Sequence, residues 1–278
     1  MEILGYSERG IINALFYDIL NSPTPTTLIS DLLNLTIFIN KKEEVEFNIS
    51  ECKVLIEQSF SDFGDSDVLL LVENSGKKQA IFLEAKVKTY SGKWDIVKEF
   101  TKFKDLKGKD RNGNKIIPTS NLFTQLYFKN RLFLELGKKN RNGLDLGIKF
   151  NNTTKSPRKI GKNEIVQKAV DHLSEYIDES FYLGIIPNTQ NEIHIFIKKN
   201  FIPSQSKLKN NLTNWNTTNW GFLAWEDIHK FCVDNGLNDT CNVFDFNFYE
   251  DKKNQDKSKG QIYNKSKEQI YNKKLITS

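Results

Sequence analysis

Apolar residues at helical spacing mark the first element of the chain. Ile12, Leu15, Phe16, Ile19 and Leu20 fall on one face of a helix that begins near Ser7 and ends before the prolines at positions 23 and 25. Ser7 is a suitable N-cap for this helix. Glu8 lies one turn before Ile12 on the same face, so its carboxylate should point toward whatever that face packs against. A second short helix is predicted over residues 27–35.

Three strand-like segments follow these helices. Residues 53–60 alternate between apolar and polar positions, whereas 68–72 and 80–83 are continuous apolar runs typical of buried central strands. The short connection at 74–77 (Asn-Ser-Gly-Lys) predicts a hairpin between the two apolar strands. Glu84, Ala85 and Lys86 continue directly from the second of them.

The rest of the chain alternates between helical and extended patterns. We predict helices at 94–106, 121–136 (capped by Ser120), 164–177 and 226–235, strands at 181–186, 192–198 and 222–225, and loops at 107–115 and 138–161. The order helix, three strands, helix, strand predicts an α/β fold of three layers, with a central mixed sheet flanked by helices. We expect one domain over residues 1–250 and a Lys- and Asn-rich disordered tail over 251–278.

The charge is distributed unevenly along the chain. The formal net charge is +5, and residues 251–278 alone account for it with eight Lys against three acids. Residues 86–162 form a basic insertion with 20 Lys and Arg against six Asp and Glu, a net of +14. So polarised a charge distribution favours a polyanionic partner, although a solvated Lys-rich surface would give the same pattern.

Several classes of protein are excluded by what the sequence lacks. No segment approaches the roughly 18 apolar residues of a membrane span, and no secretory signal opens the chain. Three scattered cysteines do not form a disulfide framework and suit a reducing cytoplasm. The sequence also contains no phosphate-binding loop, no serine-hydrolase elbow and no dinucleotide fingerprint.

The charged residues with the clearest chemistry lie at the ends of the two apolar strands. In a strand, residues i and i+2 share a face, so Glu84 and Lys86 project together. If the strands pair as a hairpin, Asp67 lies beside them. Two close carboxylates repel each other unless a cation joins them, and their hard oxygens suit Mg²⁺ or Mn²⁺. Such a metal activates a bound water, and Lys86 can orient that water or stabilise charge on a phosphate, which fits phosphodiester hydrolysis.

These residues resemble the motif of a known superfamily. The sequence Gly64-x-x-Asp67, followed one hairpin later by Glu84-x-Lys86, is similar to the signature of PD-(D/E)XK (restriction-endonuclease-like) nucleases, over roughly residues 1–200. One departure is that Ser66, not proline, precedes the aspartate, and Asp65 competes with Asp67 for the metal role.

The resemblance implies a particular core and a particular ligand set. It implies an αβββαβ core, a supporting acid in the first helix at Glu8, and a metal contact from the backbone carbonyl of Ala85. It also implies that a later helix lines the site, where Gln125 or Lys129 could contact nucleic acid.

We therefore expect a Mg²⁺- or Mn²⁺-dependent nuclease of the cytoplasm that acts on DNA, in defence, restriction or repair. Lys88 and Lys93 belong to a stretch of alternating lysines and aromatics that would bind phosphates and bases, or would form an ordinary amphipathic helix with its aromatics inward. The alternatives are an RNA nuclease and a nucleic-acid-binding protein without catalysis. In a purely structural interpretation, Asp67 closes a turn, and Glu84 and Lys86 form an exposed pair. A homodimer would suit cleavage of two strands, although no sustained heptad marks an interface.

Overall fold

The computed structural model describes residues 7–39, 45–87, 94–105, 108–109, 115–116, 120–136, 160, 162–201 and 219–255. Its elements are α1 (Ser7–Leu20), α2 (Pro25–Asn34), β1 (Ile37–Phe38), β2 (Ile49–Ser59), the 3-10 turn η1 (Ser61–Phe63), β3 (Asp65–Asn74), β4 (Lys77–Ala85), α3 (Ile96–Lys104), β5 (Gly108–Lys109), β6 (Lys115–Ile116), α4 (Leu122–Leu136), α5 (Glu164–Leu173), β7 (Glu179–Ile186), α6 (Gln190–Asn200), β8 (Trp220–Ala224), α8 (Trp225–Asp234) and α9 (Asn238–Gln255).

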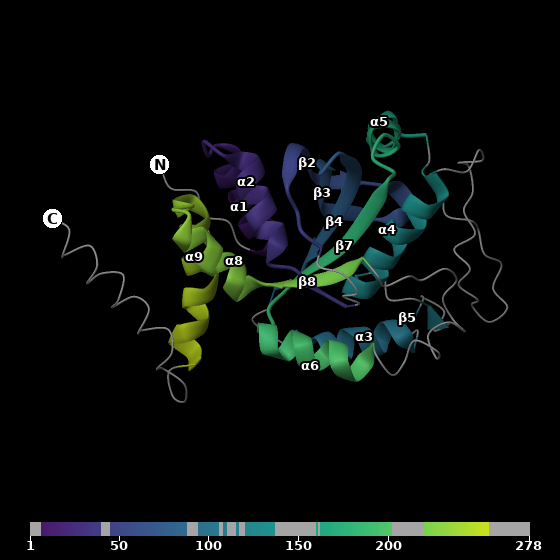
Figure 1. The fold of residues 1–278 in the computed structure, drawn as a ribbon. Helices are drawn as coiled ribbons and strands as arrows, with labels where there is room; N and C mark the ends of the chain where they lie inside the picture. Colours follow the sequence, from purple (N-terminus) through teal and green to yellow (C-terminus); the bar gives the residue numbers. More distant parts are fainter. Residues whose placement is uncertain are drawn as a thin grey trace.

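A six-stranded mixed sheet forms the centre of the molecule (Figure 1). Its strands lie in the order β1-β8-β7-β4-β3-β2. The neighbours β2–β3, β3–β4 and β1–β8 are antiparallel, whereas β4–β7 and β7–β8 are parallel. Strands β3, β4 and β7 lie inside the sheet, which is why their residues are almost entirely buried.

Helices cover both faces of this sheet, so the predicted α/β fold is confirmed. One face buries Leu69, Leu71 and Phe82 against helices α3, α4, α5 and α6. The opposite face buries Val68 and Leu83 against α1, α2, α8 and α9. The residues of β3 and β4 alternate between the two layers, as the period of a strand requires.

The hairpin between β3 and β4 forms as the sequence predicts. Ser75 and Gly76 connect the strands, and both have positive φ angles, of 51° and 78°. Two consecutive residues with positive φ are typical of the tight turns whose twist matches that of paired strands. The turn fixes the register in which Val68 faces Leu83.

The segment 192–198 is a helix, so the prediction of a strand there is wrong. Helix α6 begins with a capping box in which Thr189 and Glu192 satisfy each other's backbone N–H groups. Its buried residues are Ile193, Phe196 and Ile197, at helical spacing, while Ile195 keeps 44% of its surface exposed. Alternating isoleucines indicated a strand, but the cap and the position of Phe196 favour the helix.

Four smaller predictions need adjustment. In α4 the capping bond comes from Asn121, whose side-chain oxygen accepts the N–H of Thr124 at 3.2 Å, and not from Ser120. Leu20 is 47% exposed, and Ile11 joins the buried face of α1 in its place. The predicted loop at 107–115 contributes β5, which pairs with β6. Helix α9 continues to Gln255, past the expected domain boundary at 250.

The first and last described helices are linked to each other. The carboxylate of Asp18 in α1 accepts two hydrogen bonds from Thr240 in α9, from its backbone N–H at 2.8 Å and from its hydroxyl at 2.9 Å. At the other end of α1, the N–H of Ser7 donates to the side-chain oxygen of Asn247 at 3.1 Å. Helix α1 is therefore held by α9 at both ends, as the two neighbouring ribbons in Figure 1 show.

Among the described residues, no helix is both long and apolar enough to cross a membrane.

Candidate active site

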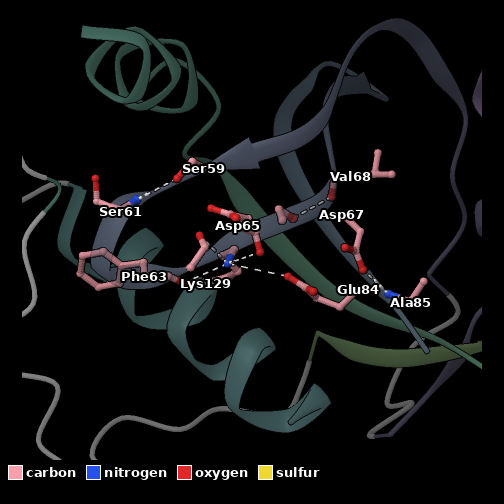
Figure 2. Close-up of polar contacts among 11 residues, drawn as sticks. Ser59, Ser61, Phe63, Asp65, Asp67, Val68, Glu84, Ala85 and Lys129 are labelled. Atoms are coloured by element: carbon pink, nitrogen blue, oxygen red, sulfur yellow. Dashed lines mark hydrogen bonds and ion pairs between the residues drawn. The ribbon is translucent and has the colours of Figure 1, made fainter. Parts of the chain in front are cut away.

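Asp67 and Glu84 lie side by side at one edge of the hairpin. Because Val68 pairs with Leu83 in the antiparallel register, the next pair places Asp67 opposite Glu84. The backbone N–H of Ala85 donates to the Asp67 carboxylate at 2.7 Å, a short bond that joins the two strands (Figure 2). The predicted proximity of these two acids is confirmed.

Glu84 is a carboxyl group without contact with solvent. Its side chain is fully buried, and neither carboxylate oxygen has a hydrogen-bond donor among the described residues. The pKa of Glu84 is raised to about 8, mainly by burial and also by the charges of Asp67 and Glu8, while Lys129 and Lys86 lower it. The exposed Glu84–Lys86 pair of the purely structural interpretation is therefore not what the chain forms.

Lys129 of helix α4 forms an ion pair with Glu84. Its ammonium lies 3.7 Å from a Glu84 oxygen, an ion pair too long to be a hydrogen bond. Neither side chain has exposed surface. Burial lowers the pKa of Lys129, and the charge of Glu84 is the strongest influence that raises it. In Figure 2 the ammonium stands between Glu84 and the backbone that leads into β3.

Lys86 is fixed through its backbone, while its side chain is only half-buried. Its N–H donates to the carbonyl of Ile185 in β7 at 2.8 Å. Its own carbonyl accepts the indole N–H of Trp225, the first residue of α8, also at 2.8 Å. The Lys86 ammonium lies near enough to act on the titration of both Glu84 and Glu8.

Glu8 reaches the same site from the first turn of α1. Burial raises its pKa, Lys86 is the strongest influence that lowers it, and Asp67 raises it again. The backbone of Val87 donates a hydrogen bond to its carboxylate. Residues from α1, β3, β4 and α4 therefore share one electrostatic environment.

The structure separates the two competing aspartates. Asp65 is exposed at the start of β3, where it pairs with Ser59 of β2. Its charge acts on Lys129, whereas it is Asp67 whose charge acts on both Glu84 and Glu8. Asp67 is therefore the aspartate that shares the site with Glu84.

The other expected site residues differ in their burial, and two of them lie outside the described residues. Gln125 is half-buried on α4, one helical turn before Lys129, and its side-chain oxygen is buried without a hydrogen-bond partner among the described residues. Ala85 is buried in β4. Lys88 and Lys93 lie outside the described residues. Lys129 has no exposed surface to offer to a nucleic acid, which corrects the expectation that it contacts one.

The aromatic side chains of α3 belong to the core. Phe100 and Phe103 are buried against α4 and the sheet, whereas Lys98, Lys102 and Lys104 are exposed. This arrangement agrees with an amphipathic helix whose lysines stay in water. It leaves these two phenylalanines unable to stack on bases.

The donor set at the strand ends fits a small hard cation. Within the described part of the chain, no three His, Cys, Asp or Glu side chains form a cluster that could hold a metal ion. Mg²⁺ commonly takes only one or two carboxylates and keeps several waters. The Glu84 oxygens without donors, together with Asp67 opposite them, provide carboxylates of that kind.

Sequence reasoning missed Lys129 as the partner of Glu84 and Trp225 as the group that binds the carbonyl of Lys86. Both belong to helices whose docking onto the sheet the local pattern does not specify.

Comparisons with protein-family models, with curated protein sequences and with solved structures find no match for this chain.

Proposed function

We propose that this chain is a metal-dependent nuclease that hydrolyses phosphodiester bonds of DNA, with a site of the PD-(D/E)XK kind. The observation that carries the proposal is Glu84, a fully buried carboxylate beside Asp67 whose oxygens have no hydrogen-bond donor within the described part of the chain. A buried carboxylate without hydrogen bonds costs free energy, and such groups occur where function requires them.

Asp67, Glu84 and the carbonyl of Ala85 would hold the divalent cation, Mg²⁺ or Mn²⁺. When bound, that cation lowers the pKa of a water and withdraws charge from the phosphoryl oxygen. Lys86 has its backbone fixed from two sides and its ammonium near enough to act on Glu84 and Glu8, which suits it to orient the attacking water. Glu8 lies where its charge acts on Lys86, so it supports the position of that ammonium.

Nucleic acid is the substrate class that the charge distribution favours. Residues 86–162 carry a net charge of +14 and begin where β4 ends, immediately after Glu84 and Ala85. A phosphate backbone bound by this segment would lie next to the carboxylates. Lys88 and Lys93 are the first candidates for these contacts.

One observation favours a second candidate function, a nucleic-acid-binding protein without catalysis. Glu84 has no exposed surface, and the ammonium of Lys129 already provides a cation 3.7 Å from its carboxyl group. A protein that had lost its metal could keep such a pair for stability alone. This second function predicts binding of DNA that depends on salt and not on Mg²⁺.

The test is cleavage of supercoiled plasmid, linear duplex, single-stranded DNA and RNA with Mg²⁺ or Mn²⁺. Glu84→Gln and Lys86→Met should each lower the rate by about 100-fold or more, because each removes a group that stabilises the transition state. Matched controls are Glu51→Gln and Lys198→Met, which change exposed residues of β2 and α6 and should leave the rate within about twofold.

The outcome also separates the two functions. Metal-dependent cleavage that disappears in both site variants and survives in both controls supports the nuclease. Binding without any cleavage supports the second function. Cleavage that survives Glu84→Gln and Lys86→Met would mean that the active site lies elsewhere in the chain.

A further inference from the structure

Lys129 is a buried lysine whose ammonium is fully hydrogen-bonded by the backbone that leads into β3. Nζ donates to the carbonyls of Phe63, Gly64 and Asp65 at 2.9, 3.0 and 3.0 Å (Figure 2). An ammonium has three protons, so these three bonds use all of them. Lysine is almost never fully buried unless it is paired, and this one is paired with three carbonyls and a carboxylate.

The backbone of the turn is shaped around this ammonium. Three consecutive carbonyls can point to one centre only if the chain turns sharply, and it does so at Gly64, whose φ is +78°. A side chain at this position would be strained, and its Cβ would stand 3.6 Å from Nζ. The turn that encloses the ammonium therefore explains Gly64 of the sequence motif, because a residue with a side chain would be strained at this φ.

The same ammonium connects the turn to the second half of the motif. It lies 3.7 Å from Glu84 on β4, and the last carbonyl that it binds, that of Asp65, comes two residues before Asp67. One side chain from α4 thus contacts both segments that contribute acids to the site. The hydrogen bond from the N–H of Ala85 to the Asp67 carboxylate also joins these two segments directly.

We propose that Lys129 is a positioning residue, which holds the turn 63–65, and through it Asp67, in a fixed relation to Glu84. Its importance for catalysis rests on the proposed nuclease function, whereas its importance for the arrangement of the two acids does not. A lysine whose ammonium is buried and hydrogen-bonded in this way stabilises the turn from inside the protein and does not contact phosphate.

The position of Asp67 can be followed without measuring activity. The amide of Ala85 is bonded to the Asp67 carboxylate, so its hydrogen exchange reports whether that carboxylate stays in place. In Lys129→Met, which keeps most of the side chain but lacks the ammonium, exchange at Ala85 should rise at least about tenfold relative to wild type. The amide of Tyr182 in β7, which donates to the carbonyl of Asn219 at 3.0 Å, is the internal control and should keep its protection.

Two further variants keep the test decisive if Lys129→Met folds poorly. Gly64→Ala perturbs the same turn without removing the charge, and it too should raise exchange at Ala85. Lys129→Ala leaves room for n-propylammonium, which should restore protection of Ala85, whereas the neutral n-propanol of similar size should not. Rescue by both compounds alike would show that Lys129 only fills space, and would overturn the proposal.

Binding and catalysis provide the second readout. In Lys129→Met the maximal rate should fall about 100-fold, while DNA affinity measured without Mg²⁺, and its salt dependence, should stay as in wild type, because the ammonium is buried. A loss of DNA affinity with a salt slope reduced by about one, and with Ala85 still protected, would identify a phosphate contact and refute the positioning role. If wild type neither cleaves nor binds Mn²⁺, the nuclease proposal fails, and exchange at Ala85 still decides the role of Lys129.

Discussion

Replacement of Glu84 by glutamine should stabilise the metal-free protein at alkaline pH. Burial raises the pKa of Glu84 from 4.5 to about 8, so between these two values the folded protein binds a proton that the unfolded chain has released. Stability therefore falls as the pH rises through this window, and the contribution of the protonated acid is fully present only below about pH 4.5. Glutamine has the shape of the protonated acid and cannot ionise.

The expected magnitude follows from the same pKa. One pKa unit corresponds to about 1.4 kcal/mol, so a rise from 4.5 to about 8 corresponds to roughly 5 kcal/mol of stability lost by wild type at pH 8. Glu84→Gln should therefore match wild type within about 1 kcal/mol at pH 5 and exceed it by roughly 3–5 kcal/mol at pH 8. Both proteins keep Lys129, but glutamine lacks the negative charge that raises the pKa of Lys129, so the difference at pH 8 is at most this large.

The assay is urea-induced unfolding in EDTA, followed by the fluorescence of the buried tryptophans Trp220 and Trp225. Glu51→Gln, on the exposed edge of β2, is the control and should track wild type within about 0.5 kcal/mol at both pH values. If the difference between Glu84→Gln and wild type is the same at pH 5 and pH 8, Glu84 does not titrate in this window. The account of Glu84 as an unsatisfied buried acid would then be refuted.

Four other outcomes are expected. Trp225→Phe removes the donor to the carbonyl of Lys86, so it should lower the free energy of unfolding by about 1 kcal/mol and also reduce the cleavage rate. An unchanged cleavage rate would mean that Trp225 does not contribute to the site. Asp18→Ala removes both bonds to Thr240 and should cost about 2 kcal/mol by urea unfolding. Thr189→Ala removes the cap of α6 and should cost about 1 kcal/mol, measured in the same way. Mg²⁺ at about 100 times its dissociation constant should stabilise wild type by about 2.7 kcal/mol, and much less stabilisation is expected in a variant that lacks Glu84.

Much of the fold follows from local sequence patterns. The continuous apolar runs at 68–72 and 80–83 and the turn between them predict the hairpin, and the hairpin alone brings Asp67 to Glu84. These features are local, because strand period and turn chemistry act over a few residues. The isoleucines of segment 192–198 suit a strand or a helix equally, and the cap and Phe196 decide for the helix.

The buried pair of Glu84 and Lys129 could not be predicted in the same way. Lys129 lies in a strongly basic stretch, where a lysine is expected to be solvated, and it is buried only because α4 docks against the turn before β3. Nothing within a few residues of position 129 specifies that turn. The burial of Glu84 depends on the same docking, so its raised pKa is a property of the assembled layers and not of the motif.

The link between α1 and α9 has a consequence for synthesis of the chain. Ser7 and Asn247 are 240 residues apart in sequence, yet their hydrogen bond holds the end of the helix from which Glu8 reaches Lys86. During translation, the hairpin with Asp67 and Glu84 leaves the ribosome long before α9 does. The nascent chain therefore carries its carboxylates without the bonds that fix α1, and the arrangement around Lys86 is completed only when almost the whole domain has emerged. If the proposed nuclease function holds, such an order of assembly would delay activity until α9 has folded onto α1.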